Sequence, residues 1–156
     1  MEDNMNLLIS LAVTAALVVA SPTTALKTAQ SDPSTQQRIV AIMEETPGGI
    51  QTGPNEVSWD GGRVILTFSS EMMPRATSCA AGKYCLFSKA NFLGDKLSFT
   101  GCSATKVNVA LPSVRSASNA RTTGTVRGYN GSTQTLTVSP GVSINTTATI
   151  KQVSCS

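Results

Sequence analysis

CAAGKYCLFSKANFLGDKLSFTGC, residues 79–102, contains an aromatic residue, Phe87, followed by six residues and then Gly94. The run 96–100 (KLSFT) comes next and alternates, which places its two apolar residues on one face of a strand. Glycine readily adopts the positive φ that a sharp bend requires. We therefore expect two strands joined by a loop that folds over them, with Phe87 closing the first strand.

Strand-like runs continue on both sides of this stretch. Upstream, residues 56–59 and 63–68 flank Asp60-Gly61, a dipeptide typical of tight turns. Downstream, alternating runs recur every eight to twelve residues or so, a spacing typical of a β-sandwich. We expect strands at 106–111, 125–129, 135–138 and 148–153, with a turn at Asn130-Gly131. Aromatic residues make up only 4% of the chain, so aliphatic side chains must form most of the core.

One segment has helical periodicity instead. Residues 34–46 carry Ile39, Val40, Ile42 and Met43 at helical spacing, and Pro47-Gly48-Gly49 ends the pattern. Ser34 or Thr35 would be the N-cap, and we expect residues 51–55 to form a loop. The helix would either pack against the sheet or act as a removable pro-segment.

Four ordered segments carry a family resemblance: NEVSWDGGRVIL, CAAGKYCLF, NFLGDKLSFTGC and SVRSASNAR. Together they resemble the secreted actinomycete peptidase-inhibitor family of βγ-crystallin type (streptomycete metalloproteinase inhibitor-like). The resemblance covers residues 34–119 and extends loosely over the rest. It implies a βγ-crystallin-like Greek-key sandwich, here with a short N-terminal helix. Phe87 and Gly94 would be its folded-hairpin signature, and Ser116, or next Ser118, the serine that bonds back to the hairpin. Tyr129 would be the aromatic of a second, degenerate motif.

The four cysteines are Cys79, Cys85, Cys102 and Cys155. An even number in an exported chain indicates two disulfides, but the residues alone leave three connectivities open. A zinc site is the competing use, and it is disfavoured because the chain has no histidine and its cysteine spacings are unlike CxxC pairs. The resemblance, with a turn at Gly82, favours Cys79–Cys85 and Cys102–Cys155.

The first 25 residues have the pattern of an export signal. Residues 7–20 form an uncharged, mostly apolar run that is short for a membrane span, and small residues follow it. The preceding segment carries two acids and no base, which is unusual for a signal; an uncleaved helix or membrane anchor is the alternative. We expect a secreted monomer, free of the membrane after cleavage, with residues 26–55 as leader and helix and 56–156 as the domain.

Charge is unevenly distributed along the chain. From residue 72 onward nine basic residues accompany a single acid, Asp95. Such a field favours an anionic partner, such as an acidic protein or an anionic cell-wall polymer, although a solvated basic surface is the simpler interpretation. The bases are scattered and scarcely interleaved with aromatic residues, so we expect no nucleic-acid binding.

Several kinds of chemistry are disfavoured by composition. Without histidine the chain cannot form a Ser–His or Cys–His pair, and no phosphate-binding loop is present. We expect no enzyme, no catalytic residue and no cofactor. Many βγ-crystallin domains bind calcium, but the corresponding positions, 111–116 and 145–150, lack carboxylates. We therefore expect no strong metal site.

The resemblance implies inhibition of extracellular peptidases. Our candidate inhibitory loop is 71–79, with Met72, Met73, Pro74 and Arg75 at its centre. A tight inhibitor presents a rigid loop, so that binding orders little further chain. The family's second short-range disulfide loop has no equivalent after Cys102, and an ordinary connector is the simpler interpretation of 71–79. A cell-surface binding module and a small secreted antimicrobial toxin are the alternative functions.

Overall fold

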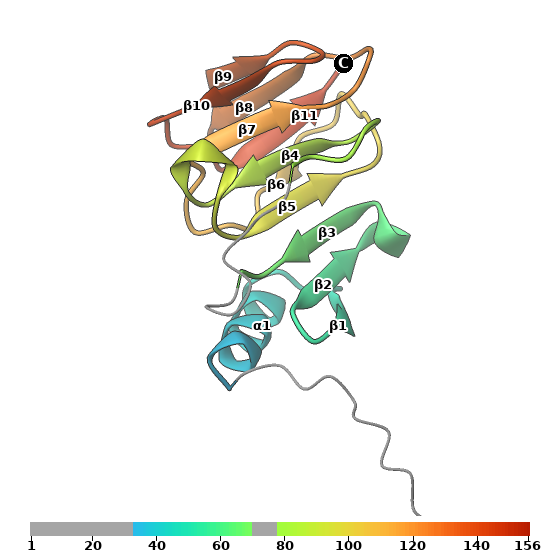
Figure 1. The fold of residues 1–156 in the computed structure, drawn as a ribbon, viewed down its shortest axis with the longest axis vertical. Helices are drawn as coiled ribbons and strands as arrows, with labels where there is room; N and C mark the ends of the chain where they lie inside the picture. The colour runs from blue at the N-terminus through green and yellow to red at the C-terminus, as the bar shows by residue number, and fades with distance from the viewer. Residues whose placement is uncertain (1–32, 70–77) are drawn as a thin grey trace, which may run out of the picture.

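The computed structural model describes residues 33–69 and 78–156. These residues form two antiparallel sheets and one short helix (Figure 1). The all-β fold class expected from the alternating runs is confirmed.

The larger sheet has seven strands in the order β1-β2-β3-β5-β4-β7-β10. Their bounds are β1 Ile50–Gly53, β2 Glu56–Trp59, β3 Val64–Thr67, β5 Lys96–Phe99, β4 Tyr84–Phe87, β7 Ser116–Asn119 and β10 Ser143–Asn145. The smaller sheet has four strands in the order β6-β11-β8-β9. Their bounds are β6 Val107–Asn108, β11 Gln152–Cys155, β8 Val126–Asn130 and β9 Thr133–Val138.

The core lies between the two sheets. Strand register aligns one apolar residue from each of six neighbouring strands into a row across the larger sheet: Val57, Leu66, Leu97, Leu86, Ala117 and Ile144. Buried residues of the smaller sheet, among them Val126, Val138 and Val153, belong to the same hydrophobic cluster. Alternation therefore buries one face of each sheet against the other.

Strand β4 is buried on both of its faces. Tyr84 and Leu86 face the core, where the Tyr84 ring stacks on Phe99 with centroids 4.5 Å apart. Burial raises the pKa of Tyr84 to about 12, and the positive charge of Arg121 partly opposes that shift. Because side chains alternate, Cys85 and Phe87 face outward, so other parts of the chain must cover them.

Helix α1, Pro33–Glu45, lies beside β1, β2 and β3 at one end of the larger sheet (Figure 1). Ile39 is fully buried and belongs to the core cluster, so α1 contributes to the same core as the two sheets. After the helix, the Trp59 indole N–H donates to the Thr46 carbonyl at 3.0 Å. A Cβ on Gly49 would lie 2.8 Å from the Trp59 ring, so this close approach requires glycine.

Three segments differ most from the sequence expectations. Residues 50–53 form edge strand β1 rather than a loop, paired with β2 through a bulge. The strand expected at 106–111 is reduced to Val107–Asn108, because beyond it a single bond, from Val109 N to Lys151 O, continues the pairing. The last strand begins at Gln152 rather than at 148.

No helix among residues 33–69 and 78–156 is both long enough and apolar enough to cross a membrane.

Candidate functional site

The loop after β4 folds back over its own strand. Asn91 and Phe92 both have positive φ, at 57° and 61°. The Ser88 and Lys89 N–H groups donate to Asp95 O and Leu93 O, at 2.9 and 3.1 Å, which closes the loop at its base. We call residues 88–95 the folded hairpin.

Gly94 is required at the end of the folded hairpin for two reasons. Its φ is +77°, a conformation that other residues adopt at a cost. A Cβ at this position would also lie 2.3 Å from Ser88 Oγ, which is occupied in accepting a hydrogen bond from the Asp95 N–H at 2.8 Å. Gly94 therefore lies where the backbone comes close to the Ser88 side chain of its own loop.

Ser116 of β7 joins the folded hairpin to the sheet. Its buried hydroxyl accepts from the Phe92 N–H at 3.0 Å and donates to Lys89 O at 2.7 Å. The Phe92 ring then meets Phe87 edge-on, with centroids 5.7 Å apart. The hairpin thus covers the outward-facing Phe87, which is fully buried.

Replacing Ser116 with alanine should destabilise the fold by about 1–3 kcal/mol, because it leaves the Phe92 N–H and the Lys89 carbonyl without their partner. Urea unfolding followed by circular dichroism measures the loss. Ser118→Ala is the matched control on the same strand. Among residues 33–69 and 78–156, the Ser118 hydroxyl bonds only to the exposed Ser143 hydroxyl, at 2.7 Å, so we expect a change within about 0.5 kcal/mol. Equal losses in both variants would contradict this role of Ser116.

A second link ties the folded hairpin to β10. Asn91 and Asn145 bond reciprocally: the Asn91 N–H donates to Asn145 Oδ1 at 2.8 Å, and Asn145 Nδ2 donates to Asn91 Oδ1 at 3.0 Å. Asn145 is the first residue of 145–150, the second position that corresponds to a calcium site, and its side-chain oxygen already accepts a hydrogen bond here. Among the described residues, no three His, Cys, Asp or Glu side chains cluster as metal ligands.

Asp95, directly after Gly94, is the electrostatic centre of this region. Its side chain is buried and forms an ion pair with Arg38 of α1. Its other oxygen, Oδ1, accepts from the backbone N–H and the hydroxyl of Ser69, at 2.9 and 3.0 Å. The Arg38 guanidinium also lies 4.8 Å above the Phe68 ring centroid. One carboxylate therefore holds α1, the folded hairpin and the end of the segment after β3.

The structure contains both disulfides. Cys79–Cys85, with Cα atoms 5.6 Å apart, lies on the outward face of β4. Cys102–Cys155 joins the loop after β5 to the last strand. The candidate residues Met72, Met73, Pro74 and Arg75 lie outside the described residues. The described chain stops at Ser69 and resumes at Ser78, so the positions that bound this segment are known.

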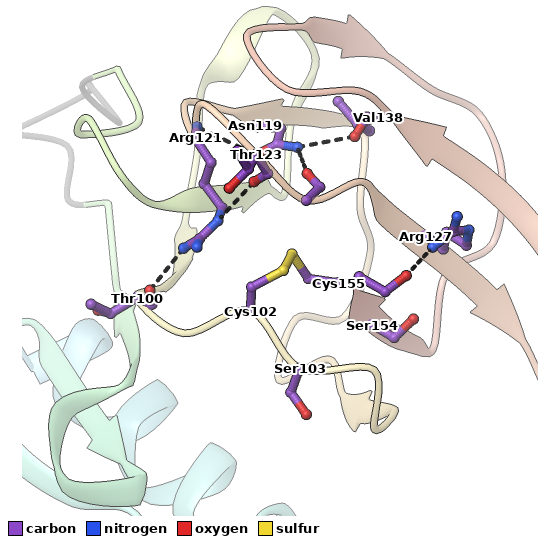
Figure 2. The surroundings of a disulfide bond; sticks show 12 residues. Thr100, Cys102, Ser103, Asn119, Arg121, Thr123, Arg127, Val138, Ser154 and Cys155 are labelled. Atoms are coloured by element: carbon purple, nitrogen blue, oxygen red, sulfur yellow. Dashed lines mark hydrogen bonds between the residues drawn. A yellow bond between two sulfur atoms is a disulfide. The ribbon is translucent and has the colours of Figure 1, made fainter.

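Figure 2 shows the surroundings of Cys102–Cys155, in which Cys155 is buried and Cys102 is exposed. A Cβ on Gly124 would lie 2.6 Å from Cys102 Sγ, so the backbone passes directly over the bond. Arg121 donates to Gly82 O and Thr100 O, at 2.9 and 3.0 Å. Arg121 is one of the nine basic residues after residue 72, and its hydrogen bonds join three loops.

The other bases that we expected to attract an anion are spread over several surfaces. Lys89 of the folded hairpin and Arg115 near it are exposed, Lys106 directly precedes β6, and Arg127 belongs to β8. Lys96 is half-buried, and desolvation is the main reason that its pKa is lowered; the charge of Lys83 adds to the shift and Glu56 opposes it.

A groove of about 610 Å³ separates α1 from the loop 108–112. Its apolar lining includes Ile42, Leu66 and Phe68, and Arg38 and Asp95 lie at its wall. The ion pair described above therefore borders the groove as well as the folded hairpin.

Comparison with known proteins agrees with this geometry. Residues 73–135, less than half of the chain, match the model of Peptidase inhibitor family I36. The match includes Phe87, Gly94 and Ser116 and confirms the resemblance found in the sequence. No curated protein and no solved structure matches the chain significantly. The matched family and the two disulfides fit a disulfide-stabilised peptidase inhibitor.

Proposed function

Starting from this match to a peptidase inhibitor family, we propose that the chain is a secreted, non-enzymatic inhibitor of extracellular peptidases and that residues 71–79 are its contact loop. Export would use residues 1–25 as a cleaved signal, which places the cysteines where disulfides persist. The domain would then act as a monomer.

The observation that carries this proposal is the anchoring of the candidate loop at both ends. At one end Ser69 is held by two hydrogen bonds to the buried Asp95. At the other end Cys79 is bonded covalently to Cys85 on the central strand β4. A segment whose two ends are fixed loses less conformational entropy when a peptidase binds it, which is the principle behind rigid inhibitory loops.

The nature of the loop residues also supports contact with a partner. Met72 and Met73 have flexible, polarisable side chains that adapt to apolar pockets, and Arg75 offers a planar set of hydrogen-bond donors. The family match begins at residue 73, within this loop. Binding energy at protein interfaces concentrates in a few such side chains.

The test measures inhibition by the exported protein. The full chain is produced in an oxidising host, and the mass of the secreted product identifies its first residue, which we expect to be Ser21 or Leu26. Residual activity of a thermolysin-like metallopeptidase and a subtilisin-like serine peptidase is then followed against inhibitor concentration. We expect stoichiometric, saturable loss of one activity.

Variants then locate the contact. Arg75→Gln and Met73→Ala should each weaken inhibition by ~10-fold or more, as truncation of a central interface residue does. Lys89→Gln is the matched control, because it removes one exposed charge from the folded hairpin. Cys79→Ser combined with Cys85→Ser should weaken inhibition by releasing one end of the loop. Full activity of both peptidases at micromolar excess of oxidised protein would reject the proposal for these two classes.

A further inference from the structure

The outer face of the smaller sheet carries two rows of polar residues. Strand register aligns Thr137, Arg127 and Ser154 in one row, in which the Ser154 side chain is buried. The second row crosses all four strands and consists of Gln134, Tyr129, Gln152 and Asn108. Their neighbours along each strand, such as Val126, Val138 and Val153, are buried in the core, so these rows face away from it. We call these two rows, together with Lys106, the amide face.

Contacts within the amide face hold its side chains in place. The Tyr129 hydroxyl lies 3.4 Å from Ser154 Oγ, which keeps the ring across the sheet. Lys106 Nζ lies 3.9 Å above that ring and donates to Gly131 O at 3.3 Å. The cation is therefore positioned by an aromatic ring and a carbonyl, neither of which neutralises its charge.

The amide side chains keep hydrogen-bonding capacity. Gln152 Nε2 donates to Asn108 Oδ1 at 3.1 Å. Within the described residues, this bond leaves the Asn108 amino group and the Gln152 carbonyl oxygen available to a ligand. Gln134 donates to Thr137 Oγ1 at 2.9 Å. A row of donors and acceptors beside a fixed ring and a cation suits a ligand that has many hydroxyl groups and a negative charge.

The charged side chains on and around the amide face are all positive. Residues 96–156, which include the whole smaller sheet, contain no Asp or Glu. The acidic side chains of the described residues lie in α1 or in the larger sheet and its turns: Glu44, Glu45, Glu56, Asp60 and Asp95. Lys106 and Arg127 supply the positive charge on the amide face, and Arg127 donates to Ser156 Oγ at 2.5 Å. Such a surface attracts anions and repels cations.

We propose that the amide face binds an anionic polysaccharide. The second row spans three strand spacings, about 14 Å, which is longer than a single small anion. Its polar groups repeat from strand to strand, which fits an extended polymer rather than a ligand enclosed in a pocket. Because the amide face is on the opposite side of the sandwich from the outward-facing Cys79–Cys85, polymer and peptidase can bind at the same time.

The test uses agarose-bound polymers and the full oxidised chain. Polygalacturonate is the anionic polysaccharide, poly(glycerol phosphate) is an anionic polymer without sugar units, and dextran is the neutral polysaccharide. We expect retention on polygalacturonate at low salt, release as salt is raised, and passage through dextran. Passage of the wild-type chain through polygalacturonate, or retention on poly(glycerol phosphate) alone, would overturn the proposal.

Paired variants separate a site from general charge. Lys106→Gln with Arg127→Gln should weaken retention by ~10-fold or more, because both charge-assisted contacts are removed. Lys89→Gln with Arg115→Gln removes the same charge near the folded hairpin, and we expect less than a ~3-fold effect. Gln152→Ala, which leaves the charge unchanged, should also weaken retention. Equal losses in the two double variants, or none with Gln152→Ala, would overturn the proposal.

Peptidase inhibition serves as the independent measurement. The Lys106→Gln, Arg127→Gln variant should inhibit as the wild type does, because its substitutions lie on the other side of the sandwich from Cys79, the last residue of the candidate loop. Failure of inhibition in every variant would reject the proposed function while leaving the polymer result intact. Circular dichroism and the unfolding midpoint of each variant confirm that the fold is retained.

Discussion

Removing the disulfide between Cys102 and Cys155 with two alanines should lower the free energy of unfolding by about 4 kcal/mol. The bond joins residues 53 positions apart. In the loop-entropy description, the conformational entropy that the unfolded chain gains when the bond is removed rises with the logarithm of that separation. A loss of this size is a large part of the stability of a domain of this length. Equilibrium unfolding in urea, with the slope compared between variants, measures it.

The second disulfide provides the matched control. Cys79–Cys85 closes a loop with a separation of only 6, so its removal should cost about 2 kcal/mol by the same relation. The essential result is that removing Cys102–Cys155 should destabilise the protein more than removing Cys79–Cys85. If the short loop proved more important than the long one, local packing on β4 rather than loop closure would determine how the cysteines stabilise this fold.

Phe87→Ala should destabilise the fold by about 3–5 kcal/mol, the range for truncating a buried phenylalanine. The side chain is fully buried although it faces away from the main core, because the folded hairpin covers it. Its loss would leave a cavity beneath Phe92 and weaken the contact that holds the hairpin down. Thermal and urea unfolding measure the effect.

Phe92→Ala is the informative comparison for Phe87. Its ring is the other half of the edge-on pair, but it is only partly buried, so the loss should be smaller, about 1–2 kcal/mol. A larger loss for Phe92 than for Phe87 would show that loop closure, rather than burial against the sheet, determines the stability of the motif.

The folded hairpin was predictable because its signals are local. An aromatic residue, a glycine at fixed spacing and an alternating strand all lie within residues 87–100, and the backbone there has the positive φ values that such a bend requires. The β2–β3 hairpin was predictable for the same reason. In both places the sequence signal and the structure concern the same few residues.

Elements that depend on distant partners were harder to predict. β1 has three exposed residues out of four and no apolar alternation, so only its pairing with β2 makes it a strand. β10 is a three-residue strand whose role comes from pairing with β7. Residues 106–111 alternate strongly, yet only two of them have a full strand partner.

The candidate site shows the same limit. Asp95 entered the sequence analysis only as the single acid after residue 72, but it is buried against Arg38, 57 positions away, and Ser69, 26 positions away. Nothing in the local pattern indicates either partner. The contact loop itself, 71–79, stays a prediction, as does the removal of residues 1–25.

β10 follows β9 and precedes β11 in the chain, yet it pairs in the larger sheet while they pair in the smaller one. This order affects how the protein folds during synthesis. β10, near the end of the chain, completes the larger sheet, and its Asn145 bonds to the folded hairpin 54 positions earlier. During synthesis the folded hairpin is therefore made long before Asn145, which bonds to it. Such non-local topology slows folding. The proposed export of the chain in an unfolded state would benefit from that delay, since the last contacts form only after the C-terminal residues have arrived.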